Sequence, residues 1–220
     1  MKSAIGLQDN EDLAFFGKVN ASISHELKNI LAIVSETAGF LNDLTEMAAE
    51  AKEIDLEMLK TCSKDIVEEI QRGFATIKQM NRFSHSMDEP FKTIDLSEIL
   101  NLMIGLAGFL SFSSIVRFEH REESGPVIFT CPFRLQNLIY QSLVFAFESS
   151  GPDGEIDVSI HDGQKGGVGI HFSGLSPIDA GTFPTDKMTR VAEAIGAQIC
   201  ASADSRAFDI LLPIKADAGE

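Results

Sequence analysis

The chain has 220 residues, of which 44% are hydrophobic and 23% charged, as expected of an ordinary globular protein with one large or two small domains. Its formal net charge of -15 argues against nucleic acid and anionic membranes as partners, because both attract clusters of Lys and Arg. Three widely spaced cysteines form no zinc-binding pattern and suit a reducing compartment. These features predict a cytoplasmic protein without a metal site.

Residues 11 to about 88 contain no proline and read as two long helices. Asp55 is the expected cap of the second helix. Two helices with one apolar face each cannot bury those faces alone, so we expect a helical hairpin that forms a four-helix bundle in a homodimer. The apolar residues recur at steps of three, four or seven: Phe16, Ile23, Leu27, Ile30, Val34 and Leu41, then Leu59, Cys62, Ile66, Ile70, Phe74 and Ile77.

The next stretch, residues 99–116, carries no charge over 18 residues, which is long enough to cross a membrane. No basic cluster flanks it, and serines divide it into a helix-like and a strand-like part. We therefore predict a buried helix followed by a strand, capped by Asp95 or Ser97, and no membrane association.

The second half alternates strands and helices, which predicts a two-layer α/β domain. The predicted division of the chain is a helical domain over 1–88 and an α/β domain over 89–220. Strands are expected near 115–120 and 126–130, helices over 131–150 and from 183 to Gly196, and hairpins over 155–174 and 198–213.

In the first helix, "ASISHELKN" (residues 21–29) places a histidine, an acid and an asparagine close together. At about 100° per residue, His25 shares a stripe with Ser22 and Asn29, opposite the apolar seam. The alternative is a simple surface histidine. Imidazole is a good nucleophile near neutral pH, and we expect Glu26 to hydrogen-bond one ring nitrogen and Asn29 to orient a water or a phosphoryl oxygen.

The segment "FGKVNASISHELKNILAIV" resembles the phosphoacceptor segment of bacterial sensor histidine kinases, and "MNRFSHSMDEPFKTIDLSEIL" resembles their linker into the ATP-binding domain. The resemblance implies that His25 is phosphorylated, that Glu26 is its acid–base partner and that Asn29 assists dephosphorylation of a receiver domain. It implies an ATPase-type α/β sandwich for the second domain. Ile30 departs from the family, which often has proline there.

The second domain departs from that family at its nucleotide positions. Aligned from Arg134, the two family asparagines that help hold magnesium and phosphates become Gln141 and Phe145, and Ser173 stands at the expected adenine-binding acid. The phosphate loop near residues 180–191 has one glycine, Gly181, so little is present to cradle a triphosphate. This predicts a degenerate domain that does not bind ATP, and no resident metal.

Together these patterns predict a phosphorelay protein that transfers a phosphoryl group between His25 and the aspartate of a response-regulator receiver, with Mg²⁺ supplied by the receiver. Receiver phosphatase activity is a possible further output. Two alternatives stay open: an active ATP-dependent histidine kinase with divergent nucleotide boxes, and a non-catalytic dimeric signalling scaffold.

Overall fold

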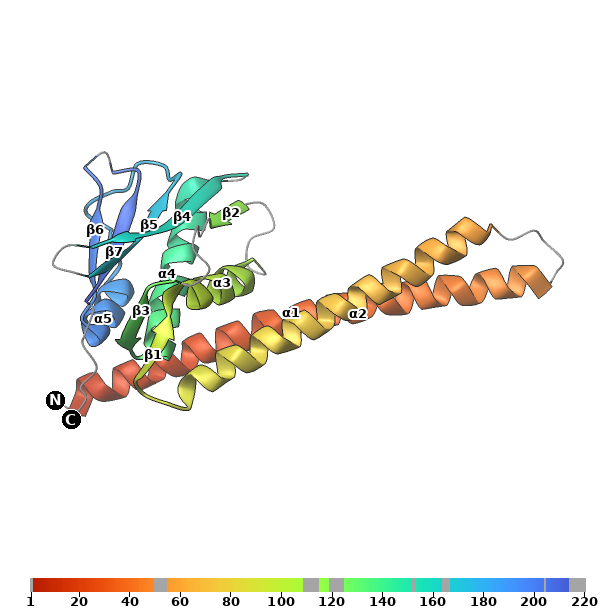
Figure 1. The fold of residues 1–220 in the computed structure, drawn as a ribbon, viewed down its shortest axis with the longest axis horizontal. Coiled ribbons are helices and arrows are strands. Elements are labelled where there is room, and N and C mark those ends of the chain that lie inside the picture. Colours follow the sequence, from red (N-terminus) through yellow and green to blue (C-terminus); the bar gives the residue numbers. More distant parts are fainter. Residues whose placement is uncertain are drawn as a thin grey trace. The chain divides into compact units, whose positions relative to one another are not determined.

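A computed structural model describes residues 2–49, 55–108, 115–118, 125–151, 153–163, 167–203 and 205–213, with side chains from residue 10 onward. Internal contacts divide the chain into two compact units (Figure 1). One comprises residues 17–81, and the other joins residues up to 16 with residues from 82 onward.

The helical unit is formed by the greater part of α1 (Lys2–Ala49) and of α2 (Leu56–Ser84), and these two helices confirm the predicted hairpin. The side chain of Asp55 accepts a hydrogen bond from the Glu57 N–H at 2.9 Å, as expected of the cap. Gly73 of α2 lies so close to α1 that an added Cβ would stand 3.6 Å from Ile30. The helices therefore approach closely near the middle of the unit.

The α/β unit contains a mixed five-stranded sheet in the order β2-β4-β5-β7-β6, in which only β2 and β4 pair in parallel. A separate antiparallel pair is formed by β1 and β3. Helices α3, α4 and α5 form the second layer (Figure 1), as the predicted α/β sandwich requires. The bounds are η1 (His85–Met87), β1 (Lys92–Asp95), α3 (Leu96–Ala107), β2 (Ile115–Phe118), β3 (Val127–Thr130), α4 (Pro132–Ser150), β4 (Glu155–Asp162), β5 (Val168–Ser173), α5 (Asp186–Ile195), β6 (Gln198–Ala201) and β7 (Phe208–Leu212).

Local sequence signals account for several of these boundaries. Asp95 caps α3 by accepting from the N–H groups of Ser97 and Glu98, which selects it over Ser97 as the cap. Gly196 ends α5 in the left-handed conformation that favours glycine. Alternate residues of β7 are buried, as are Val168, Ile170 and Phe172 of β5, so one face of the sheet carries the core.

The apolar stretch at 99–116 contains the predicted helix, which ends at Ala107, and the start of the predicted strand at Ile115. Residues 109–114 between them lie outside the described residues. Most of α3 is buried within the α/β unit. No helix among the described residues is both long and apolar enough to span a membrane.

The beginning of α1 belongs to the α/β unit. Phe15 is 1% exposed and packs against Phe83, Phe133 and Tyr140, with ring centroids 5.2–5.5 Å apart. The division by contacts therefore differs from the predicted boundary at residue 88, because the first turns of α1 are bound by helices from the second half of the chain.

Charged side chains add to this contact. Asp12 lies 3.4 Å from the Asn137 amide and 3.7 Å from Arg134 Nε on α4. Arg190 of α5 donates to both oxygens of Glu11, at 2.6 and 3.4 Å. The Glu11 carboxylate raises the pKa of Arg190 above its usual value. Helices α4 and α5 thus both contact acidic side chains, Asp12 and Glu11, in one turn of α1.

We expect Phe15→Ala to destabilise the α/β unit by about 3–5 kcal/mol, because it empties a fully buried aromatic site. Leu13→Ala is the matched control: Leu13 is 68% exposed and should change the free energy of unfolding by less than about 0.5 kcal/mol. Urea unfolding of the three chains measures both values. Equal stability of Phe15→Ala and Leu13→Ala would contradict the packing.

Candidate functional site

His25 is exposed on the polar face of α1, as the sequence pattern predicts. The Asn29 amide Nδ2 lies 3.3 Å from His25 Nδ1. Residues four apart on a helix stand one above the other, so this contact follows from the local backbone. The amide therefore restricts the rotation of the ring.

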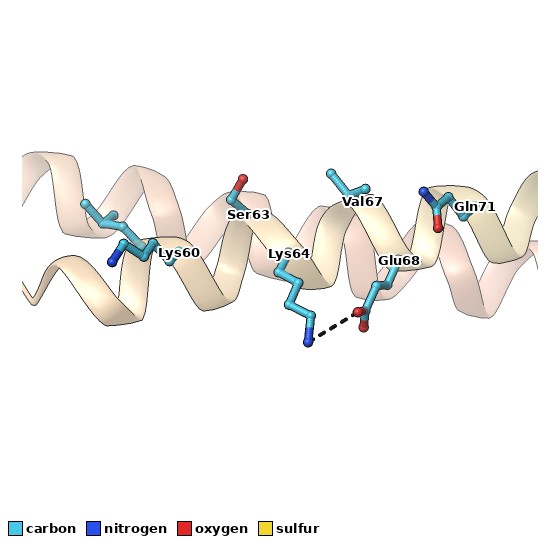
Figure 2. A pocket seen from close by; sticks show the side chains of 7 residues that line it. Lys60, Ser63, Lys64, Val67, Glu68 and Gln71 are labelled. Atoms are coloured by element: carbon cyan, nitrogen blue, oxygen red, sulfur yellow. Dashed lines mark ion pairs between the residues drawn. The ribbon is translucent and has the colours of Figure 1, made fainter.

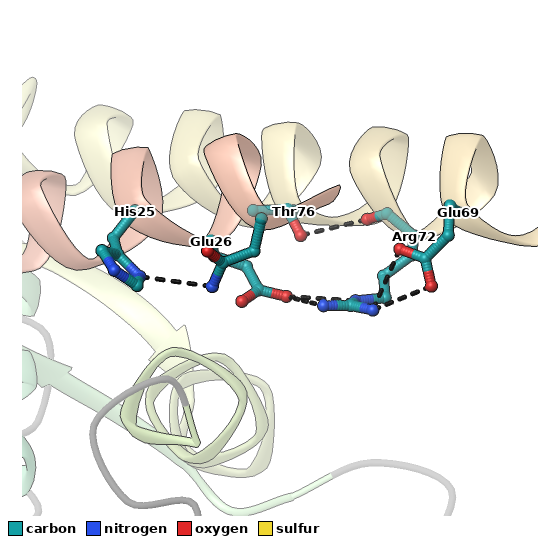
Figure 3. Close-up of polar contacts among 6 residues, drawn as sticks. His25, Glu26, Glu69, Arg72 and Thr76 are labelled. Atoms are coloured by element: carbon teal, nitrogen blue, oxygen red, sulfur yellow. Dashed lines mark hydrogen bonds and ion pairs between the residues drawn. The ribbon is translucent and has the colours of Figure 1, made fainter. Parts of the chain in front are cut away.

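Glu26 points to α2 rather than to the His25 ring (Figure 3). It is 7% exposed, and its Oε1 accepts hydrogen bonds from both Nε (3.0 Å) and Nη2 of Arg72. The expected hydrogen bond between Glu26 and the ring is absent from the described contacts. Consecutive helical residues lie about 100° apart, which directs Glu26 toward the seam between the helices while His25 faces solvent.

Arg72 also holds a second carboxylate. Its Nη1 donates to both oxygens of Glu69 at 2.9 and 3.0 Å, and Thr76 donates to the Arg72 carbonyl at 3.0 Å (Figure 3). The hydrogen bond to Glu26 is the largest of the effects that raise the pKa of Arg72, which partial burial offsets only in part. Sequence reasoning did not identify Arg72 or Glu69 as part of the site. The only local signal was their i,i+3 spacing.

The contact at Nδ1 bears on the nucleophilicity of His25. An imidazole bonded to an acceptor at Nδ1 keeps its proton there and leaves the Nε2 lone pair free. The Asn29 side chain offers an acceptor oxygen when its amide is rotated by 180° and a donor nitrogen otherwise. As placed, with Nδ2 against Nδ1, the amide donates to the ring, which leaves the ring proton on Nε2; the reactive tautomer with a free Nε2 lone pair requires the rotated amide, which presents its oxygen to Nδ1.

A stripe of exposed apolar residues runs along the helical unit. On α2, Val67, Ile70, Phe74 and Ile77 are 40–69% exposed at alternating steps of three and four. On α1, Ile33, Phe40 and Met47 are exposed at steps of seven. A spacing of three and four is the pattern of a helical seam, so this stripe has the form of an interface between helices.

An open groove of about 600 Å³ adjoins this stripe on α2, and Val67 belongs to both (Figure 2). The Lys64 ammonium and the Glu68 carboxylate pair across its polar side at 3.4 Å. Its lining residues all come from one helix: Leu59, Lys60, Ser63, Lys64, Val67, Glu68 and Gln71.

The structure does not bring the three expected nucleotide positions together. Gln141 donates to Asn137 Oδ1 at 3.1 Å. The Phe145 ring packs on Phe183 and Phe208, with centroids 4.7 and 5.9 Å away. The position aligned with a magnesium-binding asparagine is therefore occupied by an aromatic cluster.

Ser173 lies apart from that cluster and lines a pocket of about 560 Å³ together with His171 and Arg206. Successive strand residues face opposite sides, and in β5 the core face carries Phe172, which stacks on Phe208 at 4.7 Å. The β5 residue that joins the aromatic cluster is thus Phe172, the neighbour of Ser173.

A second group of titratable side chains lies on the outer face of the sheet. Asp209 Oδ1 is 2.9 Å from both His161 Nε2 and His171 Nδ1. Partial burial lowers the pKa of His161, but the Asp162 carbonyl and the Asp209 carboxylate outweigh it, so the pKa lies above its usual value of 6.5. No group of three or more His, Cys, Asp or Glu among the described residues is arranged to hold a metal ion.

A raised histidine pKa stabilises the fold below pH 6.5, and that stability is lost as the pH rises through the folded-state pKa. We therefore expect the Tm to fall as the pH is raised from about 6 to 8, and to fall less in His161→Gln. The effect is small, because the ring is 41% exposed. Scanning calorimetry across this range tests it, and an unchanged slope in His161→Gln would refute it.

No family model matches the sequence, and no curated protein does. Among solved structures, the chain is similar to histidine kinases. The Acinetobacter baumannii histidine kinase AdeS is 10% identical, with 87% of this chain and 98% of that chain covered and a TM-score of 0.48. The ATP binding domain of PrrB from Mycobacterium tuberculosis is 16% identical, with coverages of 58% and 100% and a TM-score of 0.46.

The histidine kinase ThkA, solved in complex with the response regulator protein TrrA, is 18% identical. Its match covers 94% of this chain and 64% of that chain, with a TM-score of 0.43. At these identities and scores the likenesses assign no activity.

Proposed function

We propose that this chain is a dimeric histidine phosphotransfer protein of two-component signalling, in which His25 exchanges a phosphoryl group with the aspartate of a response-regulator receiver. The observation that carries this proposal is an exposed imidazole held by an amide at one ring nitrogen, on a helix stripe open to a partner. Nucleophilic imidazoles at accessible positions suit the transfer of phosphoryl groups between proteins.

The transfer balances as a displacement at phosphorus. The Nε2 lone pair of His25 forms the N–P bond, the P–O bond of the acyl phosphate breaks, and its electron pair stays on the receiver carboxylate. The proton on Nδ1 passes to solvent, which reaches the exposed ring. Mg²⁺ comes with the receiver.

Asn29 supports a second output at the same site. Its amide lies beside the ring and carries no charge, so it can orient a water toward a receiver acyl phosphate as well as hold His25. This gives receiver dephosphorylation without a phosphohistidine intermediate. Asn29→Ala is expected to remove this output and also to slow transfer, because the same amide holds the ring.

A second copy of the chain is the partner that fits the exposed stripe on α1 and α2. The stripe is apolar, has the spacing of a helical seam, and adjoins an open groove along α2. Two hairpins that pack along it form a four-helix bundle, which covers side chains that a single hairpin leaves in water.

The aromatic cluster around Phe145 speaks against an ATP-dependent kinase, because a phenylalanine ring offers no ligand to magnesium or phosphate. The test is incubation with labelled ATP and Mg²⁺, and separately with a panel of phosphorylated receivers, quenched in alkali where phosphohistidine survives. We expect label on the chain from a receiver and none from ATP.

Each other outcome overturns part of the proposal. Label from ATP would make the chain a kinase and refute the degenerate nucleotide site. Release of phosphate without label would leave only the phosphatase output. Neither label nor release would favour a scaffold that acts by binding alone.

A further inference from the structure

The pocket that Ser173 lines lies in the α/β unit, and the proposed function makes no use of it. Its volume is about 560 Å³, and it forms where β5 ends, beside the turn between β6 and β7. Two backbone hydrogen bonds fix these segments. The Leu175 N–H donates to the Arg206 carbonyl at 3.3 Å, and the Ala207 N–H donates to Ser202 Oγ at 3.1 Å.

The polar side chains of this pocket are cations and hydroxyls. His171 and Arg206 carry or can carry a positive charge, and Ser173 and Ser202 supply hydroxyls. No carboxylate among the described residues lines it. A guanidinium presents its N–H donors in a planar fork that matches two oxygens of an oxyanion, and a hydroxyl can donate to a third. The lining is thus opposite in sign to the chain as a whole, whose formal net charge is -15.

His171 is held so that one ring nitrogen is left for a ligand. Its Nδ1 lies 2.9 Å from Oδ1 of Asp209, the residue that pairs with it on β7. An ionised carboxylate only accepts hydrogen bonds, so Nδ1 carries a proton and Nε2 is the nitrogen that remains for the pocket. When the ring is protonated, Nε2 becomes a donor and Asp209 stabilises the positive charge.

The negative charge of Asp209 is also met by a second histidine. His161 Nε2 lies 2.9 Å from the same Oδ1, and His161 Nδ1 lies 3.0 Å from the backbone carbonyl of the next residue. Both ring nitrogens face acceptors, so with Asp209 ionised the ring is an imidazolium. Gly169 makes room for it, because a Cβ there would stand 2.1 Å from the ring. The pair of His161 and Asp209 is neutral, which leaves His171 and Arg206 as the charges of the pocket.

The other charged groups near Ser173 lie outside the lining of the pocket. Asp157 of β4 pairs with Ser173 in the sheet, and Arg117 of β2 pairs with Asp157. The Arg117 guanidinium donates to Glu155 at 2.6 Å. These three groups together leave one negative charge in excess. The positive charge of the lining exceeds it when His171 is protonated.

We propose that this pocket binds a small tetrahedral oxyanion of the phosphate class, held by the Arg206 guanidinium, the Nε2–H of protonated His171 and the Ser173 hydroxyl. Asp209 acts through His171 as a positioning residue and touches no ligand atom. Binding weakens as the pH rises, because His171 then loses the proton that it donates. The site does not involve His25, so it is tested independently of the proposed phosphoryl exchange.

The experiment follows the histidine ring signals of the full chain by NMR while an anion is added at constant ionic strength. The His171 signal is the one that disappears in His171→Gln. We expect it to shift saturably with phosphate, glycerol phosphate or sulfate at about pH 6, and far less with acetate. Phosphate and glycerol phosphate are compared because the same donors suit a free phosphate and a phosphomonoester, and the tighter ligand identifies the source.

Sulfate keeps its charge over about pH 5.5 to 8, so it reports the titration of the protein alone. We expect the affinity for sulfate to fall about tenfold over this range, since one charge-assisted hydrogen bond is lost when His171 becomes neutral. Arg206→Gln should weaken sulfate binding about tenfold or more at pH 6. Arg206→Lys keeps the charge without the fork, so its affinity should lie between the two.

Arg117→Gln is the matched control. Arg117 is an exposed arginine of the same sheet that pairs with Glu155 and does not line the pocket, so its loss should leave sulfate binding unchanged. A His171 signal that fails to saturate with any of the anions would overturn the proposal. Equal weakening by Arg206→Gln and Arg117→Gln would do the same, because it would indicate general charge screening.

Two further outcomes would count against the assigned chemistry. Acetate that binds as tightly as phosphate would refute the assignment to a tetrahedral oxyanion. An affinity for sulfate that stays constant from about pH 5.5 to 8 would remove His171 from the site and contradict the proposed set of donors.

Discussion

His25→Ala is expected to abolish phosphoryl transfer from a receiver, with a fall of at least about 1,000-fold in the rate at which the chain is labelled. The reason is chemical: the substitution removes the only atom that forms the N–P bond, and neither Glu26 nor Asn29 can replace an imidazole. The fold should survive, because His25 is exposed and its described contact is with Asn29 alone. Labelling with a phosphorylated receiver and an alkali quench measures the effect.

His85 provides the control for this variant. It too is an exposed histidine beside an acid, with Nδ1 2.8 Å from Asp88 Oδ2, but it lies in η1 and has no amide on its ring. His85→Ala should be labelled at the wild-type rate. Loss of label in His85→Ala with retention in His25→Ala would reassign the phosphoacceptor and remove the basis of the proposed function.

Phe74→Glu is expected to convert the proposed dimer to a monomer, with at least about a 100-fold weaker association, because it places an unpaired charge in an apolar seam. Phe74 is 69% exposed in the single chain and lies within the stripe that runs from Val67 to Ile77. Sedimentation velocity over a range of concentrations measures the dissociation. Unfolding of the hairpin is not expected, because the ring is not part of its buried core.

The control is Ala75→Glu, which adds the same side chain one residue away. Ala75 is exposed on α2 but lies about 100° around the helix from Phe74, outside the stripe. It should leave association unchanged. A wild type that sediments as a monomer at every concentration would refute the four-helix bundle, and equal weakening by both variants would show that the stripe is not the interface.

Features that depend on helical periodicity or on local capping residues were predicted correctly from the sequence. The hairpin, the exposed position of His25, the Asp55 cap and the end of α5 at Gly196 all depend on residues within one or two turns of each other. The contact between His25 and Asn29 is of the same kind, since helix geometry brings residues four apart together. The catalytic roles of His25, Glu26 and Asn29 remain predictions.

The predicted partner of Glu26 differs from the structure. Glu26 and His25 are consecutive, and helix geometry alone turns their side chains apart. The sequence did not indicate which face of β5 carries Ser173: successive strand residues face opposite sides, and in the structure Ser173 lines an outer pocket while Phe172 joins the core.

The sequence by itself determined the order of the elements, the polar face that carries His25 and the apolar periodicity of α2 through Ile70, Phe74 and Ile77, because these follow from local periodicity. Only the tertiary structure decided that Arg72 binds Glu26, which lies 46 residues earlier in the sequence, and that Phe15 packs into the α/β unit. Such contacts depend on the relative register of two helices and on which buried gap a side chain fills. Packing of the whole unit sets both, and no short stretch of sequence encodes either.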